Sequence, residues 1–215
     1  MVIGFHLKWG EAVYAVFLCC YPNPPPLILK YIADRTALYY GQIPALGNIF
    51  DTWITSEASA PHFSPDSRVW VYIAERDLSE QESAYAEQQL ADFCCQWTAH
   101  NQQLRATAEV FDRQFVLLMV DETQAGASGC SIDKSVHFLE NLGRTLGADL
   151  FERMRFGWLD PAGSLHMSRR DDFTQLVQLG NIAADTLVVN TLAQTKRDLE
   201  EKWLLPYGKS WHRRL

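Results

Sequence analysis

The chain has 215 residues, 47% of them hydrophobic, so it is long enough to bury a substantial core and too short for two large domains. Its formal net charge of −7 argues against a nucleic-acid-binding protein, because neutralising phosphates requires an excess of Lys and Arg on at least one face. The longest apolar run, Ala12 to Tyr21, is half the length of a membrane-spanning helix, so no membrane protein is expected.

Cysteine usage indicates the compartment. The five cysteines are two adjacent pairs, Cys19-Cys20 and Cys94-Cys95, and the single Cys130. Their number is odd and their spacing is neither that of a disulfide framework nor that of a zinc site. The histidines are dispersed as well, so the sequence predicts no metal site and no cofactor. We therefore expect a cytoplasmic protein.

The N-terminal region differs from the rest of the chain. Residues 21–26 form a polyproline-like connector, and residues 56–67 are rich in Ser, Ala and Pro. We expect residues 1–65 to be an irregular or partly helical N-terminal extension, either weakly ordered or a small docking subdomain. Residues 66–215 are expected to form an α+β domain.

The first regular elements are a strand and a helix. Residues 68–75 alternate β-branched and aromatic side chains, which is typical of a strand. Ser79 and Glu82 have the spacing of a capping box that begins a helix, predicted to extend to about His100. Helical spacing predicts one buried face, which comprises Ala86, Leu90, Phe93, Cys94 and Trp97.

Two strand-like runs follow, at residues 104–111 and 114–120, and their short connection at Asp112-Arg113 demands an antiparallel hairpin. A second helix is expected after the loop 121–129, and Gly147 supplies its left-handed end. Its predicted buried face comprises Ile132, Val136, Leu139, Leu142 and Leu146. Another hairpin is predicted around the turn at 160–163.

This order of elements predicts a ferredoxin-like βαββαβ core with an extra hairpin strand, in which both helices cover one face of an antiparallel sheet. A C-terminal helix-strand-helix extension follows. Its first helix is predicted from a Ser168/Asp171 capping box to Gly180, its strand over 186–192, and its last helix from Thr195 through Trp203.

The most unusual stretch is the small-residue loop 125–133, which lies just before the second helix. Backbone amides freed by such a loop can bind an anion together with the helix N-terminus. The predicted ligand-binding residues there are Gly126, Ser128, Gly129 and Ser131. In the alternative interpretation, the serines only cap the helix and the glycines only make a tight connection.

Cys130 lies in the same loop and is a candidate nucleophile. Asp133 and His137 share its helical face, but a rise of ~1.5 Å per residue separates Cys130 from His137 by about 10 Å. The candidate base is therefore His100, at the predicted end of the first helix. In the basic, aromatic tail, His212 and Arg213 are predicted to contact a ligand, unless Trp211 packs on the domain and leaves the arginines in solvent.

Several motifs together resemble a small bacterial family whose members are often labelled "ABC transporter ATPase". The motifs are RVWVY at 68–72, QWTAH at 96–100, SGCSID at 128–133, SVH at 135–137, DLFER at 149–153 and SWHR at 210–213. The resemblance covers residues 68–215 and implies no activity. The sequence lacks the Gly-x-x-x-x-Gly-Lys-Ser/Thr pattern that an ATPase of this kind needs.

The sequence predicts a binding domain in which a small anionic ligand or a protein partner contacts the loop from Ser128 to Ser131. One alternative is a thiol-dependent enzyme or redox protein that uses Cys130 and His100. A further alternative is an oligomeric assembly module that pairs through an open sheet edge.

Overall fold

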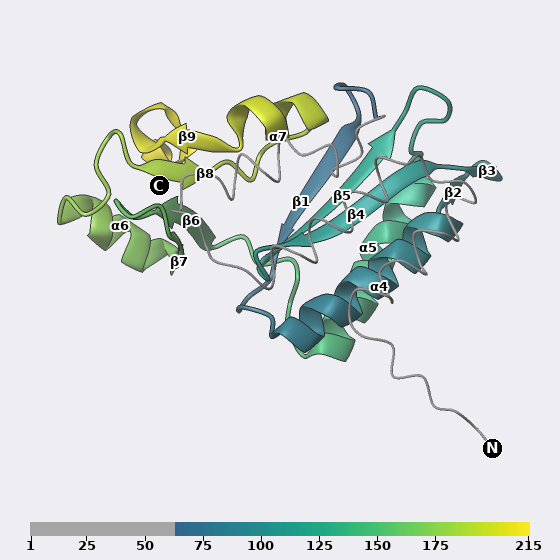
Figure 1. Cartoon of the computed structure of the whole chain (residues 1–215), viewed down its shortest axis with the longest axis horizontal. Coiled ribbons are helices and arrows are strands. Elements are labelled where there is room, and N and C mark those ends of the chain that lie inside the picture. Colours follow the sequence, from purple (N-terminus) through teal and green to yellow (C-terminus); the bar gives the residue numbers. More distant parts are fainter. Residues whose placement is uncertain (1–62) are drawn as a thin grey trace, which may run out of the picture.

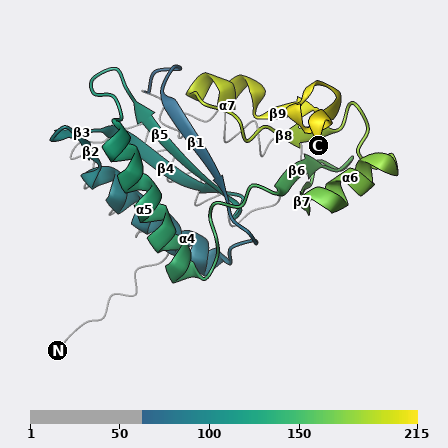
Figure 2. The same cartoon turned by 180° about the vertical axis from the view of Figure 1, so that it is seen from behind.

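The computed structural model describes residues 63–215, so the predicted extension at 1–65 lies almost wholly outside the described residues. The fold is α+β, as predicted, and has two antiparallel sheets with helices packed on them (Figures 1 and 2). Different helices pack on each of the two sheets.

The first sheet has three strands in the order β1-β5-β4: β1 (Arg68–Ile73), β5 (Phe115–Asp121) and β4 (Arg105–Phe111). Three residues connect β4 to β5, and the first two, Asp112 and Arg113, have positive φ, which suits a tight hairpin and confirms the predicted antiparallel connection. All seven residues of β5 are buried, because the central strand is covered on both faces.

Two long helices cover one face of this sheet: α4 (Glu80–Gln96) and α5 (Gly129–Leu146) (Figures 1 and 2). The predicted capping box begins α4, where Ser79 Oγ accepts from Glu82 N and Glu82 Oε2 accepts from Ser79 N. A hydrogen bond from Arg76 lowers the pKa of the Glu82 carboxyl to about 2. Gly147 ends α5 with a φ of 60°, as predicted.

The first helix is shorter than predicted. It ends at Gln96 because Trp97 adopts extended backbone and donates its buried indole N–H to Ser131 O at 2.8 Å. The chain then forms a two-residue hairpin, β2 (Thr98–Ala99) and β3 (Gln102–Gln103). His100 and Asn101 have positive φ in its turn, so the prediction that His100 ends a helix was wrong.

The buried face of α5 also differs from the prediction. Leu139, Leu142 and Leu146 are buried as expected, but Ile132 and Val136 are only half-buried. Ser131 and Ser135 take the inward positions instead. Their neighbours Trp97 and Tyr72 are bulky and leave room only for small side chains.

The second sheet has the strand order β7-β6-β8-β9: β6 (Arg155–Leu159), β7 (Leu165–Arg169), β8 (Leu187–Val189) and β9 (Leu204–Pro206). The predicted hairpin between β6 and β7 is confirmed, with Gly163 at a φ of 84°. The predicted strand over 186–192 is confirmed as the shorter β8.

The division of the strands between two separate sheets bears on the ferredoxin-like prediction. The observed order β1, α4, β4, β5, α5, β6 follows the predicted sequence of types, apart from the small β2–β3 hairpin. In a ferredoxin-like fold β6 would join β1 in one sheet, whereas here it pairs with β7 and β8. Beyond the α+β class, the ferredoxin-like prediction is therefore not confirmed.

Short helical elements complete the second half of the described chain: α6 (Arg170–Gln178), α7 (Lys196–Lys202), η1 (Tyr207–Lys209) and η2 (Trp211–Arg214). The Thr195 cap of α7 is confirmed, since Thr195 Oγ1 accepts from Asp198 N. The predicted Ser168 cap of α6 was wrong. Ser168 lies in β7 and accepts a hydrogen bond from Trp158 Nε1.

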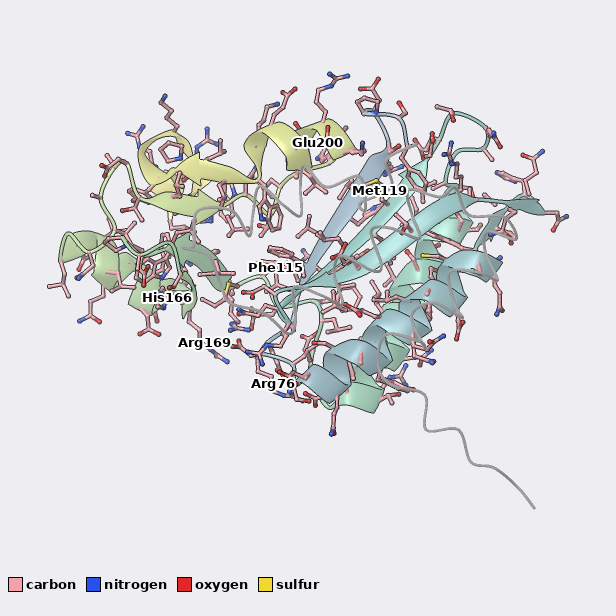
Figure 3. The ribbon with its side chains drawn as sticks, viewed as in Figure 1. Arg76, Phe115, Met119, His166, Arg169 and Glu200 are labelled. Atoms are coloured by element: carbon pink, nitrogen blue, oxygen red, sulfur yellow. The ribbon has the colours of Figure 1, made fainter. Side chains whose placement is uncertain are left out.

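The side of the first sheet opposite the two long helices packs against the second sheet. Phe115 and Met119 project to this side from β5 and share one apolar cluster with Val189 and Trp203 (Figure 3). Beside it, the buried Arg155 of β6 donates to Ala74 O at 2.6 Å, Asp77 Oδ1 at 3.1 Å and Gln114 Oε1 at 3.2 Å.

We expect Arg155→Met to lower the free energy of unfolding by about 2–4 kcal/mol, because it leaves the buried acceptors Ala74 O and Gln114 Oε1 without a donor. Asp77→Asn is the matched control and should cost less than about 1 kcal/mol, since the Asp77 side chain is 56% exposed. Urea unfolding of the full chain measures both. Equal losses for the two variants would contradict this role of Arg155.

Candidate functional site

The predicted loop leads into α5 and its serines cap the helix. Ser131 N donates to Ser128 Oγ at 3.3 Å, and Ser131 Oγ donates back to Ser128 O at 2.8 Å. Ser131 is buried, and its carbonyl accepts the indole N–H of Trp97. These contacts give both serines a structural role in fixing the start of α5 against the end of α4.

A carboxylate occupies part of the loop in which an anion was predicted to bind. Glu122 Oε1 accepts from Ala127 N at 2.9 Å, and a Cβ added to Gly126 would lie 3.8 Å from the same oxygen. Nothing lies within 4 Å of a Cβ placed at Gly129. The Glu122 charge opposes a second anion, so the local electrostatics disfavour an anionic ligand at this loop.

Cys130 is the second residue of α5 and has an exposed, free thiol. It lies at one end of a shallow, wide-open depression along one face of α5, and every lining residue belongs to that helix. We call this feature the α5 groove. Its lining residues are Cys130, Asp133, Lys134, His137, Phe138 and Asn141.

The floor of the α5 groove is aromatic and its rim is charged. Phe138 is half-buried and stacks on Phe93 of α4, with ring centroids 4.4 Å apart. Phe93 in turn contacts Trp97, so the floor is continuous with the aromatic side chains between α4 and α5. Lys134 is exposed and forms no ion pair with any residue in the described part of the chain.

Neither of the two histidines considered as a base, His100 and His137, is positioned on the Cys130 thiol. His137 Nδ1 lies 2.8 Å from Asp133 O, so this ring nitrogen forms its hydrogen bond with the backbone of its own helix. His100 is exposed in the β2–β3 turn, and within residues 63–215 no hydrogen bond joins it to Cys130. The predicted pair of Cys130 and His100 is therefore not assembled as a catalytic contact in this structure.

The two predicted ligand-binding residues of the tail lie elsewhere. The C-terminus rests beside β8 and β9, far from α5 in both views (Figures 1 and 2). His212 is only 1% exposed and lies among aromatic rings, whereas Arg213 is exposed and donates to Gly208 O. Burial therefore leaves the His212 side chain no surface for a ligand.

The remaining cysteines and metal-ligating residues form no further site in the described chain. Cys94 is buried in the core, as predicted, and Cys95 is disulfide-bonded. Because Cys95 is oxidised here, a cytoplasmic location stays a prediction. Residues 63–215 contain no group of three or more His, Cys, Asp and Glu side chains suited to a metal, and no helix among them is long and apolar enough to span a membrane.

Sequence reasoning did not identify Lys134, Phe138 and Asn141 as lining residues of the α5 groove. Their positions relative to Cys130, at +4, +8 and +11, are those of one helical face, so the spacing could have identified them.

No family model, no curated protein and no solved structure matches this chain. The resemblance to a small bacterial family therefore stays a prediction that rests on the motifs themselves.

The two free thiols of residues 63–215 should differ sharply in reactivity. We expect iodoacetamide at pH 8 to alkylate Cys130 in the native protein, because it is exposed. Cys94 should stay unmodified, since burial raises the pKa of its thiol to about 12 and leaves about one molecule in 10⁴ as thiolate. Peptide mass spectrometry over time measures both rates. Equal alkylation of the two cysteines would contradict the burial of Cys94.

Proposed function

We propose that this protein is a binding domain whose protein partner docks in the α5 groove. The observation that carries the proposal is the groove itself, an open surface that begins at the Ser128–Ser131 loop and follows α5 for about 16 Å. An open groove along one helix suits a protein segment better than a small molecule, which binds in enclosed pockets.

The lining residues define the chemistry of the partner. Phe138 offers an apolar surface backed by Phe93, and Lys134 offers an ammonium without a carboxylate partner among residues 63–215. A segment that places an apolar side chain on Phe138 and a carboxylate against Lys134 complements both. The occupied loop amides favour such a partner over a small anion.

The enzyme alternative receives less support, since neither His100 nor His137 contacts the Cys130 thiol. Assembly through a sheet edge, the cytoplasmic location and the bacterial family stay predictions.

Position-specific photo-crosslinking identifies the partner. A photo-reactive amino acid at Asn141, inside the groove, is compared in cells with the same amino acid at Gln178, an exposed position on α6. We expect an adduct of defined mass from position 141 and none from position 178. The adduct supports the proposal only when the purified partner also binds the full chain.

Charge reversal then tests the site. Lys134→Glu should weaken binding of the purified partner at least about tenfold, because it sets two carboxylates against each other. Lys209→Glu makes the same change on an exposed residue outside the groove and should alter affinity less than about twofold. Equal effects, or adducts from both positions, overturn the proposal. Stabilisation of the wild type by inorganic phosphate, lost in Ser128→Ala, would instead favour an anionic ligand.

A further inference from the structure

The C-terminal segment Ser210–Leu215 rests on the second sheet through aromatic rings. The centroid of the His212 ring lies 5.5 Å from that of Phe156 of β6 and 5.6 Å from that of Phe173 of α6. The ring also stacks on Trp211, with centroids 4.0 Å apart. We call this set of rings the tail cluster. It fixes the end of the chain beside β8 and β9 (Figures 1 and 2).

Hydrogen bonds hold the chain firmly only up to Gly208. Tyr207 N donates to Thr186 O at 2.7 Å and Gly208 N to Ala184 O at 2.8 Å. In the described chain, every hydrogen bond made by residues 210–215 ends on a residue between 207 and 212. Among residues 63–215, packing and the hydrogen bonds to Tyr207 and Gly208 therefore attach the segment, and its release unwinds the short η2 but breaks no strand of the described chain.

The imidazole of His212 is suited only to its neutral form. Ser210 Oγ donates its hydrogen to Tyr207 O at 3.0 Å, so it accepts at 3.2 Å from His212 Nδ1–H. Nε2 then carries the lone pair, and this atom is buried without a partner. A proton on Nε2 would create a buried cation with no acceptor, which is unfavourable.

The ring contacts and the hydrogen bond of His212 involve no carboxylate of residues 63–215. The apolar and aromatic residues packed in this cluster are Phe156 and Trp158 of β6, Phe173, Leu176 and Val177 of α6, Ile182, Val188 of β8, and Tyr207, Trp211 and Leu215. The charged side chains at the start of α6, Arg170, Asp171 and Asp172, are exposed. The charged groups of the segment itself, Arg213 and Arg214, are exposed cations that would repel a protonated imidazole.

We propose that Ser210–Leu215 is an acid-released latch, in which protonation of His212 expels the segment from the tail cluster while the first sheet stays folded. Burial lowers the pKa of His212 from 6.5 to about 4. The docked form therefore favours neutral His212. Docking is at full strength above pH 6.5, weakens as the pH falls toward 4, and levels off below pH 4 at about 300-fold weaker.

Two-dimensional NMR of the isotope-labelled full chain, titrated from pH 7 to pH 3.5, tests the latch. We expect the His212 ring to titrate below pH 5, and the signals of residues 210–215, including the Trp211 indole, to move to random-coil positions in the same range. The amides of β5 should keep their folded positions at that pH.

Two variants separate the latch from general acid unfolding. His212→Phe keeps an aromatic ring that cannot be protonated, so its tail should stay docked to pH 3.5. His166→Asn removes an exposed histidine of β7 and should leave the tail transition unchanged. The proposal is overturned if the wild-type tail stays docked, if β5 melts in the same step, or if His212→Phe releases its tail at the same pH. Should His212→Phe not fold, the wild-type titration alone decides.

Discussion

The guanidinium of Arg155 is the buried polar side-chain contact that joins the second sheet to the first, beside backbone hydrogen bonds such as Val69 N to Gln194 O. It leaves β6 and reaches a carbonyl just after β1, a carboxylate before α4 and an amide beside the β4–β5 turn. A buried cation is stable only where every donor is satisfied, so these three acceptors fix β6 in one position. An aliphatic side chain there would leave Ala74 O and Gln114 Oε1 without this donor, and apolar contacts alone have no preferred direction.

Local signals in the sequence predicted most element boundaries correctly. The Ser79/Glu82 box, the Gly147 stop, the Asp112-Arg113 turn and the Thr195 cap each act within four residues, so they do not depend on the rest of the fold. The sequence could not show which sheet β6 joins, because that choice depends on Arg155 and on contacts 41 and 81 residues away. Distant partners also ended α4 early, through the bond between Trp97 and Ser131.

The sequence predicted where the candidate site lies, but it predicted the contacts of the side chains there only in part. The start of α5 does present an exposed cysteine next to a groove. The sequence could not show that Glu122 turns back onto Ala127, or that His137 bonds to its own helix, since both depend on side-chain conformation. For the tail, composition suggested a surface that binds a ligand, whereas the burial of His212 makes it part of a core. The burial of His212 could not be predicted from composition, because the neighbouring basic residues are exposed and only His212 is buried among Trp211–Arg214.

The buried central strand of the first sheet constrains the order in which the sheet can assemble. β5 pairs with β4 across a tight turn, and with β1 across more than forty residues of sequence. Closing the short loop costs little entropy and hairpins form within about 1–10 μs, so the β4–β5 pair can exist first. Its apolar surface stays exposed to water until β1 pairs with it and both long helices pack on the sheet. During synthesis β1 and α4 emerge before β5, so only α5 is still missing when the three strands are complete, and self-association would begin at the face that α5 later covers.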